Sequence, residues 1–474
     1  NTTRSFAVTS RQQATHYVYQ VRAKNGAGLW GAYSAISDGI LVDKTAPGGV
    51  AVTDDGATTT STTQLHATWT AAADAESGIA QYEYLIRRDS TAGILIVNYT
   101  SVGLATQVTK TGLALTYGKT YYLGVRAKNA AGLYGPTTYS DGIQVTDATA
   151  PTAPGTPTEG GTTDLDYDPD GGYPVYWTAA ADAQSGVSAY ELQERAGTNG
   201  AWTTLTNTNT TRSFAVTSRQ QATHYVYQVR AKNGFGGWGP YSAVSDGMLV
   251  DKTAPAAPTV TDDGAFTAST TQLHAVWSAS DPESGIAESQ YQIRRDSLTG
   301  TILVNFTSTG TATQVTRTGL ALANGVTYYV LVKVKNGAGT WSAVGNSDGI
   351  KVDTTPPSAV VVTDDGIVTA SSSQLHATWT ASSDPDSGIA EYQYQIRQDS
   401  AAGAILRDWT SAGLVTDFTA TGISLTAGKT YFFGVRAHNG AGAASAPAFS
   451  HGIAVATGTT VDTEASIAFT AGAA

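Results

Sequence analysis

The strongest constraint on the fold is a segment that the chain repeats five times. Its first copy reads Thr-His-Tyr-Val-Tyr-Gln-Val-Arg-Ala-Lys-Asn over residues 15–25. The asparagine that ends each copy recurs at intervals of 104, 104, 103 and 103 residues (Asn25, Asn129, Asn233, Asn336 and Asn439). A period of about 100 residues is too long for one turn of a solenoid and matches one small domain. The sequence therefore predicts an array of similar domains, which favours a structural or binding role over an enzymatic one.

Short proline motifs separate the copies. Asp-Lys-Thr-Ala-Pro occupies residues 43–47 and 251–255, and variants of it end at Pro151 and Pro357. These motifs predict four complete repeats: repeat 1 (47–150), repeat 2 (151–254), repeat 3 (255–355) and repeat 4 (356–457). Residues 1–46 match the back half of repeat 2 and predict half a domain, and residues 458–474 form a short tail. Proline fixes φ and restricts its predecessor, so we expect stiff joints and a rod.

Inside a repeat the hydrophobic pattern has period two. Leu65, Ala67 and Trp69 share one face of a predicted strand, whereas His66 and Thr68 share the solvent face. Gly-containing turn signals separate about seven such strands in about 100 residues, which is typical of an antiparallel sandwich. The predicted fold class is therefore all-β, a tandem array of antiparallel sandwiches.

The repeats resemble fibronectin type III domains. The resemblance rests on a strand-B tryptophan (Trp69, Trp177, Trp277 and Trp379) and on a tyrosine that opens strand F (Tyr17, Tyr121, Tyr225, Tyr328 and Tyr431). It implies that the tryptophan fills the core and that the tyrosine hydroxyl bonds back to the backbone. It covers nearly the whole chain except the tail. The family serves as a general spacer and adhesion module, so the resemblance specifies fold better than function.

Charge and composition exclude several functions. The 27 basic and 38 acidic residues give a net charge of −11, which repels nucleic acid and anionic membranes. Without cysteine the chain has no disulfide or thiolate site, and no apolar run approaches the roughly 20 residues of a membrane helix. The single methionine is Met248 and no signal region opens the chain, so we expect a piece of a longer polypeptide, located outside the cell or on its surface.

Acidic loops suggest calcium as a candidate ligand, because hard cations prefer several oxygen ligands. In repeat 1 the candidate ligands lie in two loops (Asp54, Asp55, Asp74 and Glu76). In repeat 2 they alternate along one loop (Asp164, Asp166, Asp168 and Asp170). The twelfth position of that loop is Trp177 instead of a bidentate glutamate, which excludes a complete EF-hand. Ordinary Asp-Gly turn chemistry is the alternative interpretation.

Two further sets of residues are candidates for surface chemistry. Aromatic residues in the loop after strand F are candidates for sugar stacking or for packing against a neighbouring domain or strand (Trp30, Trp238, Tyr241 and Trp341). Four asparagines lie in glycosylation sequons (Asn1, Asn98, Asn209 and Asn305), and the last three are the candidates within the repeats. We find no nucleophile paired with a base, no phosphate loop and no zinc spacing, so we expect no enzymatic activity within these residues.

The tail suggests an assembly hypothesis. Val461, Ile467 and Phe469 alternate like a strand B that lacks its domain, and could pair with the incomplete first domain of another chain. Truncation of a longer polypeptide is the competing explanation.

Two functions fit such an array. The first is an extracellular structural or adhesive rod, including a filament subunit joined by strand addition, whose partners are copies of itself or other surface proteins. The alternative is a carbohydrate-binding or spacer region of a secreted polysaccharide-degrading enzyme, with polysaccharide as the partner.

Overall fold

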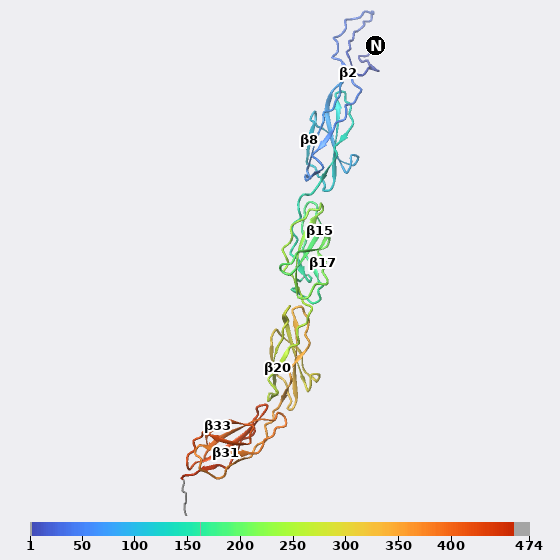
Figure 1. The fold of residues 1–474 in the computed structure, drawn as a ribbon. Helices are drawn as coiled ribbons and strands as arrows, with labels where there is room; N and C mark the ends of the chain where they lie inside the picture. Colours follow the sequence, from blue (N-terminus) through green and yellow to red (C-terminus); the bar gives the residue numbers. More distant parts are fainter. Residues whose placement is uncertain (1, 162, 459–474) are drawn as a thin grey trace, which may run out of the picture. The chain divides into compact units, whose positions relative to one another are not determined.

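The computed structural model describes residues 2–161 and 163–458, and every regular element in them is a β-strand (Figure 1). The all-β fold class is thereby confirmed, and no helix that could cross a membrane occurs in this part of the chain. The chain divides into two compact units. The first comprises Asn1–Asp164, Pro174–Ala215 and Tyr225–Gly247, and the second Leu165–Tyr173, Val216–His224 and Met248–Ala474.

Repeat 1 consists of two sheets. The strands of the first sheet are, in order, β3 (Val52–Asp54), β5 (Gln64–Trp69) and β8 (Gln107–Thr111). Those of the second are β4 (Thr58–Thr59), β11 (Ile143–Val145), β9 (Thr120–Asn129), β6 (Ile79–Arg88) and β7 (Ile94–Ser101), with β10 (Thr138–Tyr139) also on β9. A three-stranded sheet therefore faces a larger one, as in a fibronectin type III sandwich.

Repeats 3 and 4 have the same topology. In repeat 3 the first sheet contains β20 (Thr259–Asp262), β22 (Gln272–Ser278) and β25 (Gln314–Thr318). The second sheet contains β21 (Phe266–Thr267), β28 (Ile350–Val352), β26 (Thr327–Asn336), β23 (Ile286–Arg295) and β24 (Ile302–Gly310), and β27 (Gly345–Asn346) pairs with β26. In repeat 4 the first sheet contains β29 (Val362–Asp364), β31 (Gln374–Trp379) and β34 (Asp417–Thr421). The second sheet contains β30 (Val368–Thr369), β37 (Ile453–Val455), β35 (Thr430–Asn439), β32 (Ile389–Gln398) and β33 (Ala404–Gly413), and β36 (Ala448–Phe449) pairs with β35.

The strands of repeat 2 fall in both units. In the first unit one sheet holds β12 (Thr158–Glu159), β14 (Pro174–Tyr176) and β17 (Ser213–Ala215). Beside it β15 (Val187–Ala196) pairs with β16 (Thr203–Asn209) and with β18 (Thr223–Asn233) over Tyr225 to Asn233. In the second unit β13 (Tyr167–Asp168) pairs with β19 (Met248–Val250).

Each core is built around the predicted tryptophan and tyrosine. Trp69 is 6% exposed and its ring meets Tyr82 edge to face, with the centroids 5.9 Å apart. Tyr121 is fully buried, and its hydroxyl accepts a hydrogen bond of 2.9 Å from the backbone N–H of Thr116. Tyr328 and Tyr431 accept the equivalent bond at 2.9 Å, so the tyrosine corner implied by the resemblance is confirmed in these repeats.

A short parallel strand pair closes every repeat. The short second strand of each repeat pairs with its last strand, as β4 with β11, β13 with β19, β21 with β28 and β30 with β37. Backbone hydrogen bonds flank each pair. In repeat 4 the N–H of Ala454 bonds to the carbonyl of Ile367 at 2.9 Å, and that of Ala456 to Thr369 at 3.0 Å.

The segment before repeat 1 has only β1 (Thr15–Tyr17) and β2 (Ile40–Val42), which pair antiparallel. Residues 1–25 are identical in sequence to 209–233, yet the two copies differ in burial. Val21 is 71% exposed whereas Val229 is fully buried, and Ile40 is 60% exposed whereas Met248 is fully buried. The apolar face that repeat 2 buries is thus open in this segment.

Candidate functional site: the joints between repeats

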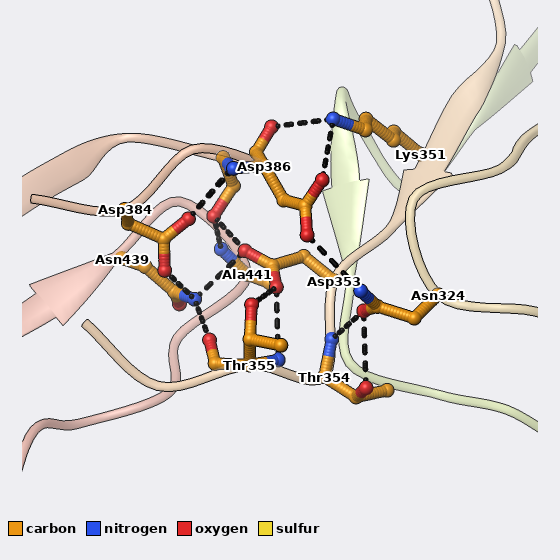
Figure 2. Close-up of polar contacts among 10 residues, drawn as sticks. Asn324, Lys351, Asp353, Thr354, Thr355, Asp384, Asp386, Asn439 and Ala441 are labelled. Carbon is orange, nitrogen blue, oxygen red and sulfur yellow. Dashed lines mark hydrogen bonds and ion pairs between the residues drawn. The ribbon is translucent and has the colours of Figure 1, made fainter. Parts of the chain in front are cut away.

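An aspartate in the linker anchors repeat 4 to the end of repeat 3. Figure 2 shows the side chains of Asp353, Asp384 and Asn439 converging at this joint. Asp353 Oδ2 accepts hydrogen bonds from Ser387 Oγ at 2.5 Å and from Asn439 Nδ2 at 2.9 Å. The Asn439 amide also donates to the Thr355 carbonyl at 2.9 Å and to Asp384 Oδ2 at 3.1 Å. One buried amide therefore ties the linker to two loops of the following repeat.

The same cluster occurs at all four joints, and we call it the joint cluster. Its members are the linker aspartate, the serine of the loop after the tryptophan strand, and the asparagine that ends the tyrosine strand. They are Asp43, Ser77 and Asn129, then Asp147, Ser185 and Asn233, then Asp251, Ser284 and Asn336, then Asp353, Ser387 and Asn439. All four asparagines are at most 2% exposed.

Local loop chemistry places these side chains. Asp384 Oδ1 accepts the backbone N–H groups of Asp386 and Ser387 at 3.0 Å each, which folds the loop that presents Ser387. Asn439 Oδ1 accepts the N–H of Ala443 at 2.7 Å and so closes the turn after β35. Aspartate and asparagine favour such turns because their short side chains reach the nearby backbone. Local hydrogen bonds within repeat 4 therefore position the serine and the asparagine that contact the linker aspartate.

The linker aspartates are held in the charged form. At Asp147 the hydrogen bonds from Thr149 and Ser185 outweigh burial, which alone would raise the pKa, and lower the pKa to about 2. The Ser77 hydroxyl is the main cause that lowers the pKa of Asp43 to about 2. At Asp353 burial again opposes the hydrogen bonds, which nevertheless lower the pKa. Hydrogen bonds to the charged form therefore dominate at the joints.

Contacts around the cluster differ from joint to joint. Between repeats 3 and 4, Asp386 accepts a hydrogen bond from Asn324 Nδ2 at 3.0 Å and pairs with Lys351 Nζ at 3.0 Å (Figure 2). Between repeats 1 and 2, the Tyr117 ring meets Phe235 at 6.4 Å between centroids. A shared anchor is thus supplemented by contacts specific to each pair of repeats.

The predicted aromatic residues lie over basic side chains of their own repeat. The Arg230 guanidinium carbon is 4.8 Å from the ring centroid of Trp238 and 4.6 Å from that of Tyr241. Lys333 Nζ is 4.3 Å from the ring centroid of Trp341. Trp30 covers Arg22 in the same way, at 4.5 Å, and is 54% exposed. These cation–π stacks explain the repeated positions, and ligand binding by the rings stays a prediction.

The acidic candidates in repeat 1 are not gathered in one place. Asp55 Oδ1 is 2.7 Å from His66 Nδ1, and Asp54 Oδ1 accepts the N–H of Gly56. Asp74 and Glu76 instead lie within 4.8 Å of the linker residue Asp43. That second group contains three carboxylates, but Asp43 and Asp74 both receive hydrogen bonds within the joint cluster.

The four aspartates predicted in repeat 2 have separate partners. Asp168 is buried and accepts backbone N–H groups of its own turn, including that of Gly172 at 3.2 Å. Asp170 Oδ1 accepts the same N–H at 2.9 Å, and Asp166 is exposed. Asp164 Oδ1 accepts the N–H of Glu159 at 2.8 Å. Metal binding by this set remains a prediction.

The remaining candidates are surface positions. Asn98 and Asn305 are exposed on β7 and β24, whereas Asn209 is half-buried and its Nδ2 donates to the Ser213 carbonyl at 2.8 Å. The assembly residues Val461, Ile467 and Phe469 lie outside the described residues.

Sequence reasoning overlooked the joint cluster, although a signal for it was present. In the sequence the asparagine marks each repeat, and the boundary prolines predict stiff joints. An aspartate, however, recurs at every boundary, and a Ser-Gly turn recurs after the tryptophan strand of every repeat. Polar residues that recur at a domain boundary indicate a shared contact there.

Fold and joints together define a tandem array of fibronectin type III sandwiches. No protein-family model matches the chain. Three Cellulomonas fimi enzymes are similar in sequence: exoglucanase B (29% identical over 65% of this chain and 26% of that protein), endoglucanase B (32%, over 47% and 20%) and exoglucanase A (34%, over 67% and 33%). The chain thus spans a third or less of the length of these relatives.

Solved structures with tandem domains are also similar. One is a tetra-tandem repeat in the extending region of a large adhesion protein, at 18% identity and a TM-score of 0.28, covering 85% of this chain and 98% of that one. Another comprises the FN1–FN3 domains of chicken CNTN1, at 17% identity and a TM-score of 0.27, covering 63% and 96%.

Proposed function

We propose that the chain is the spacer region of an extracellular bacterial enzyme that degrades polysaccharide. The chain is similar to three glucanases over 20–33% of their length, which fits a shared accessory region rather than a shared catalytic domain. In this proposal the chain itself performs no catalysis and holds a separate catalytic domain at a distance from its substrate.

The observation that supports a spacer best is the joint cluster. All four joints use the same buried asparagine and linker aspartate, with the two side chains 2.7 to 3.3 Å apart. A flexible linker has no need of such contacts, whereas a spacer that transmits position does. The cost of ordering each linker is offset by charge-assisted hydrogen bonds, which are stronger than neutral ones.

Retention on insoluble polysaccharide tests the proposal. The whole chain is incubated with microcrystalline cellulose and with insoluble xylan, and the bound fraction is measured after sedimentation. A spacer stays in the supernatant with both. Retention that Trp238→Ala and Trp341→Ala abolish would instead identify the chain as a carbohydrate-binding region.

The oligomeric state of the chain distinguishes the spacer proposal from the rod and filament hypothesis. Analytical ultracentrifugation and negative-stain electron microscopy of the same preparation are expected to show monomers. Ordered fibres would replace the spacer proposal with a filament subunit. The gene sequence on both sides of these codons supplies a second test, because the proposal requires a catalytic domain encoded in the same reading frame.

A further inference from the structure

Glu159 is a buried carboxylate without a hydrogen-bond partner. It ends β12, is 0% exposed, and neither of its carboxylate oxygens has a hydrogen-bond partner among the described residues. A buried ionised carboxylate is strongly unfavourable unless it is paired or binds a metal. An ionised Glu159 therefore needs a positively charged counterpart, and no described side chain forms an ion pair with it.

Two further carboxylates face Glu159. Ligand oxygens of Glu159, Asp164 and Asp246 all lie within 4.8 Å of one another. The N–H of Glu159 fixes Asp164 at 2.8 Å, and Asp246 follows the buried Ser245 in a Ser-Asp-Gly turn. Both aspartates are exposed, so the group is closed by protein on the side of Glu159 and open to solvent on the other. No ion pair among the described residues involves any of the three.

In repeat 4 a histidine instead of an aspartate lies near the equivalent buried carboxylate. There the strand ends in Asp364, and the turn reads Ser-His-Gly with His451 at the position of Asp246. His451 Nδ1 is 3.6 Å from Asp364 Oδ1, and the N–H of Gly452 donates to Asp364 Oδ2 at 3.2 Å. Repeat 4 thus offers the buried carboxylate a side chain that can carry positive charge, whereas repeat 2 offers it two more carboxylates.

We propose that Glu159, Asp164 and Asp246 bind a divalent hard cation, with Ca²⁺ as the best match. Three carboxylates supply an all-oxygen ligand set, and solvent at the open side completes the six to eight ligands that Ca²⁺ takes. Ca²⁺ tolerates irregular geometry, whereas Mg²⁺ demands a near-ideal octahedron, so an irregular loop site favours Ca²⁺. The site differs from the sequence-predicted set in two of its three ligands, and it does not depend on the spacer proposal.

Calorimetric titration of the whole, chelator-treated chain with CaCl₂ tests the proposal. We expect Glu159→Gln, which keeps the shape and removes the charge, to lower the number of bound Ca²⁺ ions by one. Asp246→Asn changes an exposed residue and should do the same without risk to folding. Asp262→Asn, at the position of repeat 3 that matches Glu159, is the matched control and should leave the number unchanged.

Melting with and without Ca²⁺ gives a second measurement. Calcium should raise the melting temperature of the wild-type chain, and both variants of the site should lose the part of that shift due to repeat 2. The proposal is overturned if the wild-type chain takes up no Ca²⁺, if both variants bind as many ions as the wild type, or if Asp262→Asn loses the same ion.

Discussion

Replacing Asn336 with alanine removes the donor at the centre of one joint cluster. The Asn336 amide donates to Asp251 Oδ2 at 2.8 Å, to the Thr253 carbonyl at 2.9 Å and to Asp281 Oδ2 at 3.2 Å. Its oxygen accepts the N–H of Thr340 at 2.8 Å. The side chain is fully buried, so water cannot replace these partners without rearrangement.

The expected cost follows from these bonds. A hydrogen bond to a charged group contributes about 1.5–3 kcal/mol, and a neutral one about 1 kcal/mol. Bonds that share one side chain are not additive, so we expect the free energy of unfolding of repeat 3 to fall by about 3–5 kcal/mol. This is a large part of the roughly 5–15 kcal/mol that stabilises a domain.

Hydrogen–deuterium exchange of the intact chain measures this loss for repeat 3 alone. Amides of β26 that exchange through opening of the whole repeat should exchange at least about 100-fold faster in Asn336→Ala. Asn346→Ala makes the same chemical change at an exposed position of the same repeat and should be nearly neutral. If both variants exchange alike, the joint cluster does not stabilise the repeat and the reasoning fails.

Three other predictions concern single repeats. Because the pKa of Asp147 is lowered, the stabilisation that it provides is complete above its ordinary pKa of 3.8 and is lost as the pH falls toward about 2. The melting temperature of Asp147→Asn should therefore depend less on pH over this range than that of the wild type. The hydrogen bonds with Asp365 and Asp417 raise the pKa of His376, so the stabilisation that is present below its ordinary pKa of 6.5 should be lost as the pH rises through the raised pKa, by less than about 1 kcal/mol because the carboxylates are exposed. In Gly135→Ala the new Cβ would lie 2.5 Å from the Pro47 carbonyl oxygen, which should cost repeat 1 about 1–3 kcal/mol in denaturant unfolding.

Controls for these predictions lie in the same repeats. Gly48→Ala places its Cβ 3.7 Å from the nearest atom, the Ala73 carbonyl oxygen, and should be tolerated. Asp365→Asn should weaken the pH dependence attributed to His376, and replacing Asp417 with asparagine as well should abolish it, because both carboxylates contact the imidazole. If acid lowers the melting temperature of Asp147→Asn as much as that of the wild type, other carboxylates cause the loss of stability.

The sandwich could be predicted because its determinants are local. The period-two pattern around Trp69 and the tyrosine corner at Tyr121 involve residues close together in sequence, and both are found in the structure. The joint cluster could not be derived in this way. Asp353 and Asn439 are 86 residues apart, and only folding of a whole repeat brings them within 2.9 Å.

The candidate cation site shows a similar limit. Acidic residues in the repeat 2 loop were recognised, but Asp168 satisfies its own turn and only Asp164 faces Glu159. The third ligand, Asp246, comes from a turn 82 residues further along. Clustered acidic residues in a sequence predict that a cation site is chemically possible. The burial and the hydrogen-bond partners of each carboxylate decide which of them remain free to bind the ion.

The parallel strand pair of each repeat determines how the array responds to mechanical tension. Because β30 and β37 lie side by side in parallel, a pull that reaches β30 through β29 and β37 from the other end of repeat 4 draws the two strands past each other. The hydrogen bonds of the pair, including those from Ala454 to Ile367 and from Ala456 to Thr369, are then loaded together in shear instead of opening one after the other. If the whole sandwich then unfolds, its roughly 100 residues can extend to roughly 330–360 Å, so each repeat holds a reserve of length.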